Sequence, residues 1–254
     1  MTYRKRIFEQ YHELHGRYLD GEDELKLKWF KAYAEKNYLP LLKGRITTES
    51  RILEIGCNKG YLLEAFSDGG YRDIYGIDLC EQDLQHAKTI CPGADVICES
   101  AEDYLPKHEN HFDLILIKAV LEHIEKNNVY QLLTLCNNAL TKSGLILIDV
   151  PNMDWLFASH ERYMDFTHEN GFTSESLAQV MRSIFSKNIV VPAESVYMDS
   201  KFRSMLRIAM RAFIKTCFKI AEPDVSELPL FSRSIIACGT KTNLDNAHDS
   251  RINL

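Results

Sequence analysis

Five short apolar runs between residues 51 and 150, each separated from the next by a helix-like segment, constrain the fold of this chain most. The runs are RILEIG (51–56), DIYGID (73–78), ADVICE (94–99), FDLILI (112–117) and GLILIDV (144–150). Their apolar residues follow one another with little alternation, as strands buried on both faces of a sheet require. The regular interleaving with helices indicates right-handed βαβ units. The sequence therefore predicts a doubly wound α/β fold with a mostly parallel sheet.

The flanking segments complete the predicted organisation. Residues 1–44 carry apolar and aromatic residues at helical spacing, and we expect them to form an N-terminal helical cap. The α/β domain is expected over 45–242, where NIVVPAESVYM and RSIIACGTK bring the sheet to seven strands. A helical insertion is expected at about 200–221, before the last strand. The polar residues 243–254 are expected to form a disordered tail.

Composition excludes several classes of protein. The formal net charge of -6 lacks the basic excess of a typical nucleic-acid binder, so no nucleic-acid partner is expected. The seven cysteines contain no C-x-x-C pair of the kind that holds zinc or exchanges thiols. No run reaches the roughly 20 apolar residues that span a bilayer. We therefore expect reduced cysteines in a cytoplasmic protein.

The first strand-like run leads into a glycine turn, EIGCNKGY at residues 54–61. In open α/β sheets, ligands bind beyond the carboxyl ends of the strands, where the strand order reverses. Gly56 and Gly60 permit conformations that a side chain would block, and the next helix offers free N–H groups to a carboxylate. The dinucleotide fingerprint G-x-G-x-x-G needs glycine where this chain has Asn58 and Tyr61. A nicotinamide cofactor is therefore disfavoured.

Polar residues also follow the second and third strand-like runs. Asp78 ends GIDL, where a carboxylate can accept hydrogen bonds from both hydroxyls of a ribose. CESAED at 98–103 offers a polar side chain and backbone amides to an adenine edge. The structural alternatives are that Asp78 caps a helix and that Glu102 or Asp103 is surface charge. The order and spacing of these motifs favour the functional interpretation.

Together these motifs resemble the class I S-adenosylmethionine (SAM)-dependent methyltransferases over residues 45–185. The similarity is carried by RILEIGCNKGYLLEAF, GIDL, SAED, FDLILIKAVLEHI and ALTKSGLILIDVPN. The chain departs from the family at Asn58, where a glycine is common, and at Ser100, where an acid is often found. Asparagine visits positive φ more readily than other non-glycine residues. The resemblance implies a Rossmann-like methyltransferase that uses SAM and releases S-adenosylhomocysteine (SAH).

The resemblance implies that the first turn holds the methionine part of the cofactor. Gly56 to Gly60, with Cys57 and Asn58 between them, would receive the methionine moiety. Glu54 would help to hold its ammonium group.

The resemblance places the nucleoside and the sulfonium on the later strands. Asp78 would bind the ribose diol, and Leu79 would flank the adenine. Ala101, through its amide, and Glu102 would contact the adenine edge. Lys118 would lie near the sulfonium end, with a surface ion pair as its structural alternative.

The segment SHERYMDFTHENGFTSESL (159–177) follows the fifth strand and must cross the carboxyl edge of the sheet, over the methyl group. It resembles a subgroup often found among enzymes that modify polysaccharides and cell-envelope glycans. That resemblance implies O-methylation of a sugar or phosphorylated intermediate of capsule or lipopolysaccharide biosynthesis. The alternative from another class is a non-catalytic SAM-binding or scaffold protein.

Methyl transfer from a sulfonium requires the enzyme to orient the acceptor and to remove its proton. A histidine whose pKa is near ~6.5 and whose tautomer is fixed by a carboxylate is a suitable base at neutral pH. We expect His168 to be this base, with Asp165 or Glu169 as its orienting partner. His123, after the fourth strand, is expected close to the bound sulfonium.

A polar turn without catalytic function is the structural alternative for this segment. In that interpretation His168 packs neutrally against Phe172. TSES predicts a helix start with Thr173 as its cap, so part of the segment is architectural. A metal held by His160, Asp165 and His168 is disfavoured because two histidines suit magnesium poorly, and no metal is predicted.

The segment 201–219 predicts a basic amphipathic helix. Its basic residues recur at every fourth position: Arg203, Arg207, Arg211, Lys215 and Lys219. At 100° per residue they spread over roughly 160° of the helix. Such a helix can lie on a membrane surface or meet a phosphate-bearing substrate. We favour the plainer alternative, a solvated face on a helix that packs between the sixth and seventh strands or at a homodimer interface.

Overall fold

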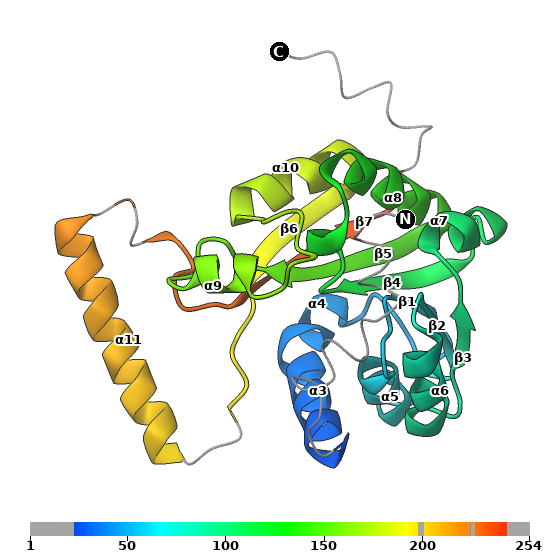
Figure 1. Ribbon diagram of the computed structural model, residues 1–254, viewed down its shortest axis with the longest axis horizontal. Helices are drawn as coiled ribbons and strands as arrows, with labels where there is room; N and C mark the ends of the chain where they lie inside the picture. The colour runs from blue at the N-terminus through cyan, green and yellow to red at the C-terminus, as the bar shows by residue number, and fades with distance from the viewer. Residues whose placement is uncertain (1–22, 198–200, 223, 225–226, 243–254) are drawn as a thin grey trace.

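The computed structural model describes residues 23–197, 201–222, 224 and 227–242, and a seven-stranded sheet lies at its centre (Figure 1). The strand order is β3-β2-β1-β4-β5-β7-β6. The strands are β1 (Arg51–Ile55), β2 (Asp73–Asp78), β3 (Asp95–Cys98), β4 (Phe112–Lys118), β5 (Leu140–Pro151), β6 (Ser186–Pro192) and β7 (Ser234–Thr240). Strands β1 to β5 pair in parallel, whereas β7 runs antiparallel to β5 and β6. The predicted doubly wound fold is confirmed.

Helices cover both faces of the sheet (Figure 1). On one face lie α3 (Asp23–Asn37), α4 (Leu39–Leu42), α5 (Tyr61–Asp68) and α6 (Glu81–Ile90). On the other lie α7 (Ala101–Tyr104), α8 (Lys126–Ala139) and α10 (Ser174–Ile184), with the short helices η1 (Leu105–Lys107) and η2 (Leu121–His123). Each layer closes its own hydrophobic core against the sheet. The predicted helical cap is described from residue 23 onwards. Its first 22 residues and the predicted tail at 243–254 lie outside the described residues.

The central strands explain the bare apolar runs in the sequence. Residues 114–117 of β4 are at most 1% exposed, because helices cover them on both sides. The edge strand β6 is different, since several of its side chains are exposed. A run without polar alternation is therefore the signature of a sheet centre in this chain.

The strand order reverses between β1 and β4. β2 lies on one side of β1 and β4 on the other, so their carboxyl ends leave a crevice between the outgoing connections. Ligands of doubly wound sheets bind at such a point. The turns after β1, β2 and β4 are therefore the ones that position the site.

The segment between β5 and α10 contains a short helix that the sequence pattern did not predict, α9 (Ala158–Tyr163). Six residues are too few to show helical periodicity in a sequence. The predicted start of α10 is confirmed, because the Thr173 side chain accepts a hydrogen bond from the Ser176 N–H, 3.2 Å away. The Thr173 N–H in turn donates to Ser176 Oγ at 2.9 Å, which completes a capping box.

Helix α11 (Lys201–Ala221) connects β6 to β7 and stands away from the sheet (Figure 1). The favoured alternative of a helix packed between the sixth and seventh strands is wrong, because its large apolar side chains are exposed. Among the residues described, every helix is too short or too polar to traverse a bilayer.

Candidate cofactor and acceptor site

A cavity of about 610 Å³ opens where the strand order reverses. Its walls come from the turn after β1, the end of β2, the residues before α7 and those after β4. The residues expected at the cofactor that line it are Glu54, Gly56, Cys57, Asn58, Asp78, Leu79, Ala101, Glu102, Lys118 and His123. Gly60, also expected there, lies just outside the lining as the N-cap of α5.

The turn after β1 depends on backbone angles that side chains disfavour. Gly56 and Gly60 have φ values of +73° and +77°, and Asn58 between them has +46°. A Cβ at Gly56 would also collide with Cγ2 of Val120. The Asn58 side chain donates a hydrogen bond to Asp83 Oδ2 at 3.0 Å, which stabilises its left-handed conformation. The departure from glycine at position 58 therefore has a local structural compensation.

Asp78 is held at the tip of β2 by two backbone amides. Its Oδ2 accepts from the Asn58 N–H at 2.8 Å, and its Oδ1 accepts from the Cys80 N–H at 2.9 Å. Burial raises the pKa of the Asp78 carboxyl, and these two amides partly oppose that shift. Each oxygen keeps a lone pair for a further donor. Cys80, rather than Asp78, is the N-cap of α6, so the cap alternative is wrong.

The third strand end has a mainly structural serine. Ser100 caps α7, since its Oγ accepts from the Asp103 N–H at 3.1 Å and donates to Asp103 Oδ2 at 2.8 Å. Ala101 is buried at the cavity wall, whereas Glu102 is exposed. Leu79 faces the cavity with 65% of its surface exposed. An apolar surface is thus available to a flat ligand at this end.

Glu54 lies buried at the floor of the cavity. It is 4% exposed, and its Oε2 has no hydrogen-bond partner among the described residues. Burial raises the pKa of the Glu54 carboxyl well above its usual range, and the nearby charge of Lys118 partly opposes this. An unpaired buried acid costs free energy unless a donor reaches it. Glu54 is therefore suited to bind a ligand cation.

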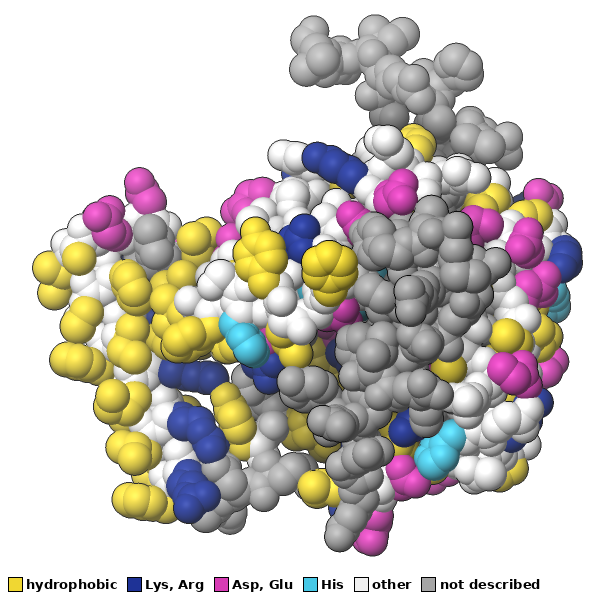
Figure 2. Space-filling model, in the orientation of Figure 1, with side chains coloured by type: hydrophobic (Ala, Val, Ile, Leu, Met, Phe, Trp, Pro, Cys, Tyr) yellow, Lys and Arg dark blue, Asp and Glu magenta, His cyan; other side chains and the backbone are white. Residues whose placement is uncertain are grey.

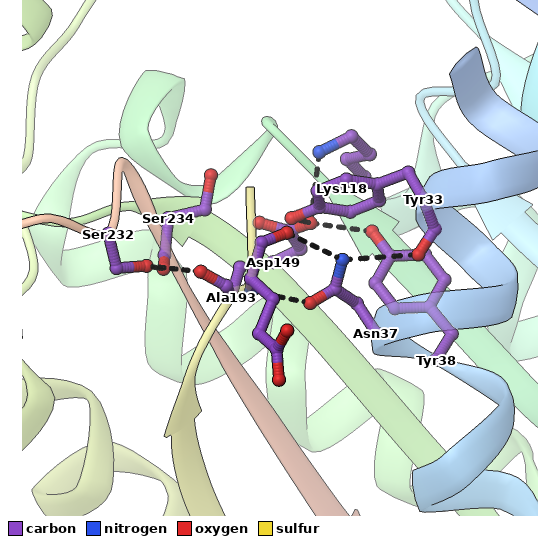
Figure 3. A network of polar contacts seen from close by, with 9 residues as sticks. Tyr33, Asn37, Tyr38, Lys118, Asp149, Ala193, Ser232 and Ser234 are labelled. Atoms are coloured by element: carbon purple, nitrogen blue, oxygen red, sulfur yellow. Dashed lines mark hydrogen bonds and ion pairs between the residues drawn. The ribbon is translucent and has the colours of Figure 1, made fainter. Parts of the chain in front are cut away.

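Lys118 belongs to a buried network that sequence reasoning missed (Figure 3). Asp149 is 1% exposed, and its Oδ2 accepts from Lys118 Nζ, Tyr33 Oη and Tyr38 Oη at 2.9, 2.8 and 2.6 Å. Lys118 Nζ also lies 4.6 Å from the centroid of the Tyr33 ring. Burial raises the pKa of both tyrosines, so both hydroxyls remain donors. The ion pair of Lys118 is therefore not on the surface: it is formed with the buried Asp149, which also connects α3 to the sheet through Tyr33.

The segment between α9 and α10 docks on the residues that follow β4. The N–H groups of Glu169 and Asn170 donate to the carbonyl of Glu122 at 2.7 and 3.0 Å. The structure thereby brings the predicted acceptor-side segment to His123 and so to the mouth of the cavity.

His123 is oriented by a relay of two further residues. Its Nδ1 lies 2.8 Å from Thr167 Oγ1, which donates its own hydrogen to Asp165 Oδ1 at 2.7 Å. Because the Thr167 hydrogen is already committed, Nδ1 of His123 must be the donor. In a neutral His123 ring the unprotonated nitrogen is then Nε2.

His168 is oriented by the main chain. Its Nδ1 donates to the carbonyl of Glu161 at 2.8 Å, since a carbonyl can only accept. The expectation that Asp165 or Glu169 orients His168 is wrong: Asp165 bonds Thr167, and a carbonyl of α9 fixes the His168 tautomer. A lone pair is left on Nε2 of His168 as well.

Glu122 is the site residue that sequence reasoning overlooked. It is 2% exposed, and its Oε2 has no hydrogen-bond partner in the described part of the chain. Burial raises the pKa of the Glu122 carboxyl to about 8. The sequence LEHI contained the signal, because an acid among buried apolar residues needs a partner or a ligand.

A sequence profile described as a methyltransferase domain matches residues 26–184 of this chain. This match spans more than half of the 254 residues and includes every wall of the cavity. The chain belongs to the methyltransferase family. The family match together with the seven-stranded fold identifies a class I SAM-dependent methyltransferase, whose cofactor is SAM.

Curated relatives match part of this methyltransferase. A ubiquinone biosynthesis O-methyltransferase of Bradyrhizobium diazoefficiens is 29% identical over 109 residues, covering 41% of each chain. A phosphoethanolamine N-methyltransferase of Plasmodium falciparum is 27% identical over 157 residues, covering 57% of this chain and 56% of the relative. The aligned segments thus span about two fifths to a little over half of these relatives.

Solved structures share the fold over most of the methyltransferase. A SAM-dependent methyltransferase from Archaeoglobus fulgidus aligns with a TM-score of 0.66 and 21% identity, covering 91% of this chain and all of that one. A putative methyltransferase of Haloferax volcanii, solved with the activator Trm112, aligns with a TM-score of 0.61 and 11% identity, covering 89% and 96%. At these identities the likeness shows the fold alone.

Proposed function

We propose that this methyltransferase transfers the methyl group of SAM to a hydroxyl acceptor. The observation that carries the proposal is His123 at the mouth of the cofactor cavity with His168 beside it, each ring bonded through Nδ1 so that its unprotonated nitrogen is Nε2. A hydroxyl is a weak nucleophile until its proton is removed, whereas the sulfonium needs no further activation. The residues expected to bind SAM and those expected to activate the acceptor therefore form two adjoining halves.

In the cofactor half, each polar group meets a complementary part of SAM. Glu54 accepts from the methionine ammonium, which satisfies its unpaired Oε2. The turn from Gly56 to Gly60 admits the methionine chain because no Cβ blocks it. Asp78 accepts from the two ribose hydroxyls with the lone pairs that the amides leave.

The remaining cofactor residues shape the cavity around the nucleoside and the sulfonium. Leu79 packs on the adenine, and Ala101 and Glu102 border its edge. Cys57 forms a buried part of the wall. Lys118 is held by Asp149 and lies close enough to Glu54 to act on its carboxyl.

In the acceptor half, His168 takes up the acceptor proton. Bound SAM would supply the methyl carbon for in-line attack by the acceptor oxygen, with the sulfur as the leaving group and SAH as the product. The proton moves to Nε2 of His168, whose Nδ1–H stays on the Glu161 carbonyl. Asp165, through Thr167, positions the His123 ring, which lies beside His168. The Glu169 N–H holds the segment on η2.

The acceptor is proposed by chemical class. The name of the Bradyrhizobium relative favours an intermediate of ubiquinone biosynthesis. The sugar or phosphorylated glycan intermediate expected from the sequence is the second candidate, supported by the segment 159–177 alone. A panel of quinone precursors, nucleotide sugars and phosphoethanolamine, assayed with labelled SAM, separates the classes.

His168→Ala tests the acceptor half. The variant should lose turnover by about 100-fold or more and keep SAH affinity within about twofold, because general-base catalysis contributes about 10²–10⁴-fold. Unchanged turnover would rule out His168 as the base. Loss of SAH affinity would instead place His168 in the cofactor half. His160→Ala on α9 is the matched control, and it should leave both quantities unchanged.

We also propose that residues 45–242 form the methyltransferase domain and that the helical cap is part of its working unit. The contacts of Tyr33 and Tyr38 with Asp149 support this, since both tyrosines precede residue 45. Tyr38→Phe should lower the free energy of unfolding by about 1.5–3 kcal/mol through loss of one hydrogen bond to a charged group, measured by urea denaturation.

A second proposal concerns α11, which we assign to the surface of an anionic membrane. Seven large apolar residues of α11 are more than half exposed: Phe202, Met205, Leu206, Ile208, Met210, Phe213 and Ile220. Figure 2 shows apolar side chains along the outer edge of α11 and Lys and Arg on the side towards the body. The helix carries six basic residues and no acidic one, whereas the whole chain has a net charge of -6.

This charge separation favours anionic lipid over a second copy of the chain. Two α11 helices packed face to face would bring like charges together, whereas anionic lipid attracts basic residues at the rim of an apolar face. Phe213→Ser should weaken sedimentation with anionic vesicles several-fold at low salt. Glu102→Gln, far from α11, is the control. Dimerisation in ultracentrifugation without vesicle binding would overturn the assignment.

A further inference from the structure

Three side chains that commonly ligate metals converge beside the cofactor cavity. Glu122, His123 and His168 each place one ligand atom within 4.8 Å of the other two. The two imidazole rings have centroids 4.7 Å apart and planes inclined at 61°. The residues come from η2 and from the segment after α9, so the docking of that segment on Glu122 creates the cluster.

Both histidines are prepared as ligands. Nδ1–H of His123 is bonded to Thr167, and Nδ1–H of His168 is bonded to the Glu161 carbonyl. In metalloproteins a ligating histidine almost always donates its other N–H in this way, which fixes the tautomer and turns the lone pair to the metal. Behind Thr167 stands the buried Asp165, which completes a carboxylate-to-histidine chain.

Glu122 supplies the independent observation. Its side chain is 2% exposed, and its Oε2 has no partner among the described residues, while one of its carboxylate oxygens belongs to the cluster. A buried polar atom without a partner costs about 1–3 kcal/mol, more when it is charged. A cation at this position removes that cost, whereas a purely structural role for Glu122 does not explain it.

The donor set selects the kind of ion. Two imidazole nitrogens and one carboxylate suit Zn²⁺, Fe²⁺ and similar first-row ions, whereas Mg²⁺ and Ca²⁺ prefer oxygen ligands. With metal–ligand distances of about 2.1 Å, ligand atoms can lie up to about 4.2 Å apart. The three ligand atoms lie within 4.8 Å of one another, which is close to this range. Three protein ligands leave a coordination position open.

We propose that Glu122, His123 and His168 form a binding site for a divalent transition-metal ion, with Zn²⁺ as the reference ion. His123 lines the cofactor cavity, so the open coordination position faces the place where the methyl group is presented. From the sequence, no metal was predicted, and the ligand set weighed there was His160, Asp165 and His168. The present proposal uses a different set and revises that prediction.

The metal site deepens the proposed function, and the catalytic consequence of a bound metal rests on that function. A hydroxyl acceptor in the open position would be a ligand, and its O–H would lose a proton to water at a lower pH than a free hydroxyl. The C–O bond then forms and the C–S bond breaks as before. His168 would act as a ligand in the loaded protein, in place of the base.

The test measures binding without an acceptor. The full chain, freed of metal by a chelator and saturated with SAH, is titrated calorimetrically with Zn²⁺ and in parallel with Mg²⁺. We expect one Zn²⁺ site of about micromolar affinity or tighter and Mg²⁺ binding at least about 100-fold weaker. Co²⁺ should give the visible absorption of a low-coordinate site with nitrogen ligands.

Variants connect the binding to these residues. Glu122→Gln and His168→Ala should each weaken Zn²⁺ binding by at least about tenfold, whereas His160→Ala should leave it unchanged. Retained SAH affinity shows that a variant is folded. If Glu122→Gln does not fold, His168→Ala is the variant that tests the site. No Zn²⁺ binding, or equal binding by wild type and folded variants, overturns the site. Methyl transfer is assayed separately on chelated samples, so its failure is distinguishable from failure of metal binding.

Discussion

The two halves of the site are built differently. The cofactor half comes from turns directly after β1, β2 and β4, and each turn is a short continuous stretch of sequence. The acceptor half forms only when the segment after α9 docks on η2, and its key contacts join residues about 44 positions apart. A parallel sheet aligns its strand ends by itself, whereas a long connection needs specific contacts. The cofactor half should therefore depend on backbone shape and the acceptor half on individual side chains.

The largest effect is expected from blocking the first turn. Gly56→Ala introduces a Cβ that collides with Val120 at a φ of +73°, so SAH affinity should fall by about 100-fold or more. Gly44→Ala is a matched control, because Gly44 has a φ of +71° but no atom within 4 Å of an added Cβ. Calorimetry should show normal SAH affinity for Gly44→Ala. Equal losses of SAH affinity in both variants would show that backbone strain, and not the collision with Val120, lowers the affinity.

A smaller effect is expected from the ribose-binding acid. Asp78→Asn removes a charged acceptor from the two amides and from the cofactor hydroxyls, and SAH affinity should fall about 10- to 100-fold. The exposed Glu109, which does not line the cavity, gives the control Glu109→Gln, which should change affinity by less than about threefold. An unaffected Asp78→Asn variant would remove Asp78 from the cofactor half.

Breaking the relay to His123 should sharpen the distinction between the halves. Thr167→Val keeps the shape of the side chain but leaves the His123 Nδ1–H without its acceptor. Turnover should fall by about tenfold, because groups behind active side chains act through orientation, while SAH affinity should be unchanged. Thr134→Val, on the outer side of α8, is the control. A parallel loss of SAH affinity would mean that the two halves are not separable.

The smallest effect concerns pH. The pKa of Glu54 is raised in the folded chain by burial, so its contribution to stability is full below the unfolded pKa near ~4.3 and is lost as pH rises towards the folded pKa. Glu54→Gln should therefore become progressively more stable than wild type as pH rises above about 4.5. Thermal unfolding without cofactor, followed between pH 5 and 8, measures this difference. A constant difference across that range would contradict the assignment of the shift to Glu54.

The sequence was informative where structure is local. Bare apolar runs identified the strands, and the turns after them identified the residues that line the cavity, including Asn58 and Asp78. Thr173 was recognised as a cap because its partner lies three residues away.

What the sequence did not disclose depends on distant or main-chain partners. Asp149 is 116 positions from Tyr33, and no local pattern joins them. The Glu161 carbonyl orients His168, but every residue has a carbonyl, so the residue types carry no signal. Glu122 was passed over because its burial depends on the docking of a segment nearly 50 residues later.

Titration of the wild-type chain with SAH, with NADH as the parallel ligand, tests whether the cavity at the strand ends binds the cofactor. We expect saturable binding of SAH at one site with about micromolar affinity, and no heat of binding with NADH. A folded chain that binds no SAH would contradict this expectation, because the cavity at the strand ends would then not be a cofactor site.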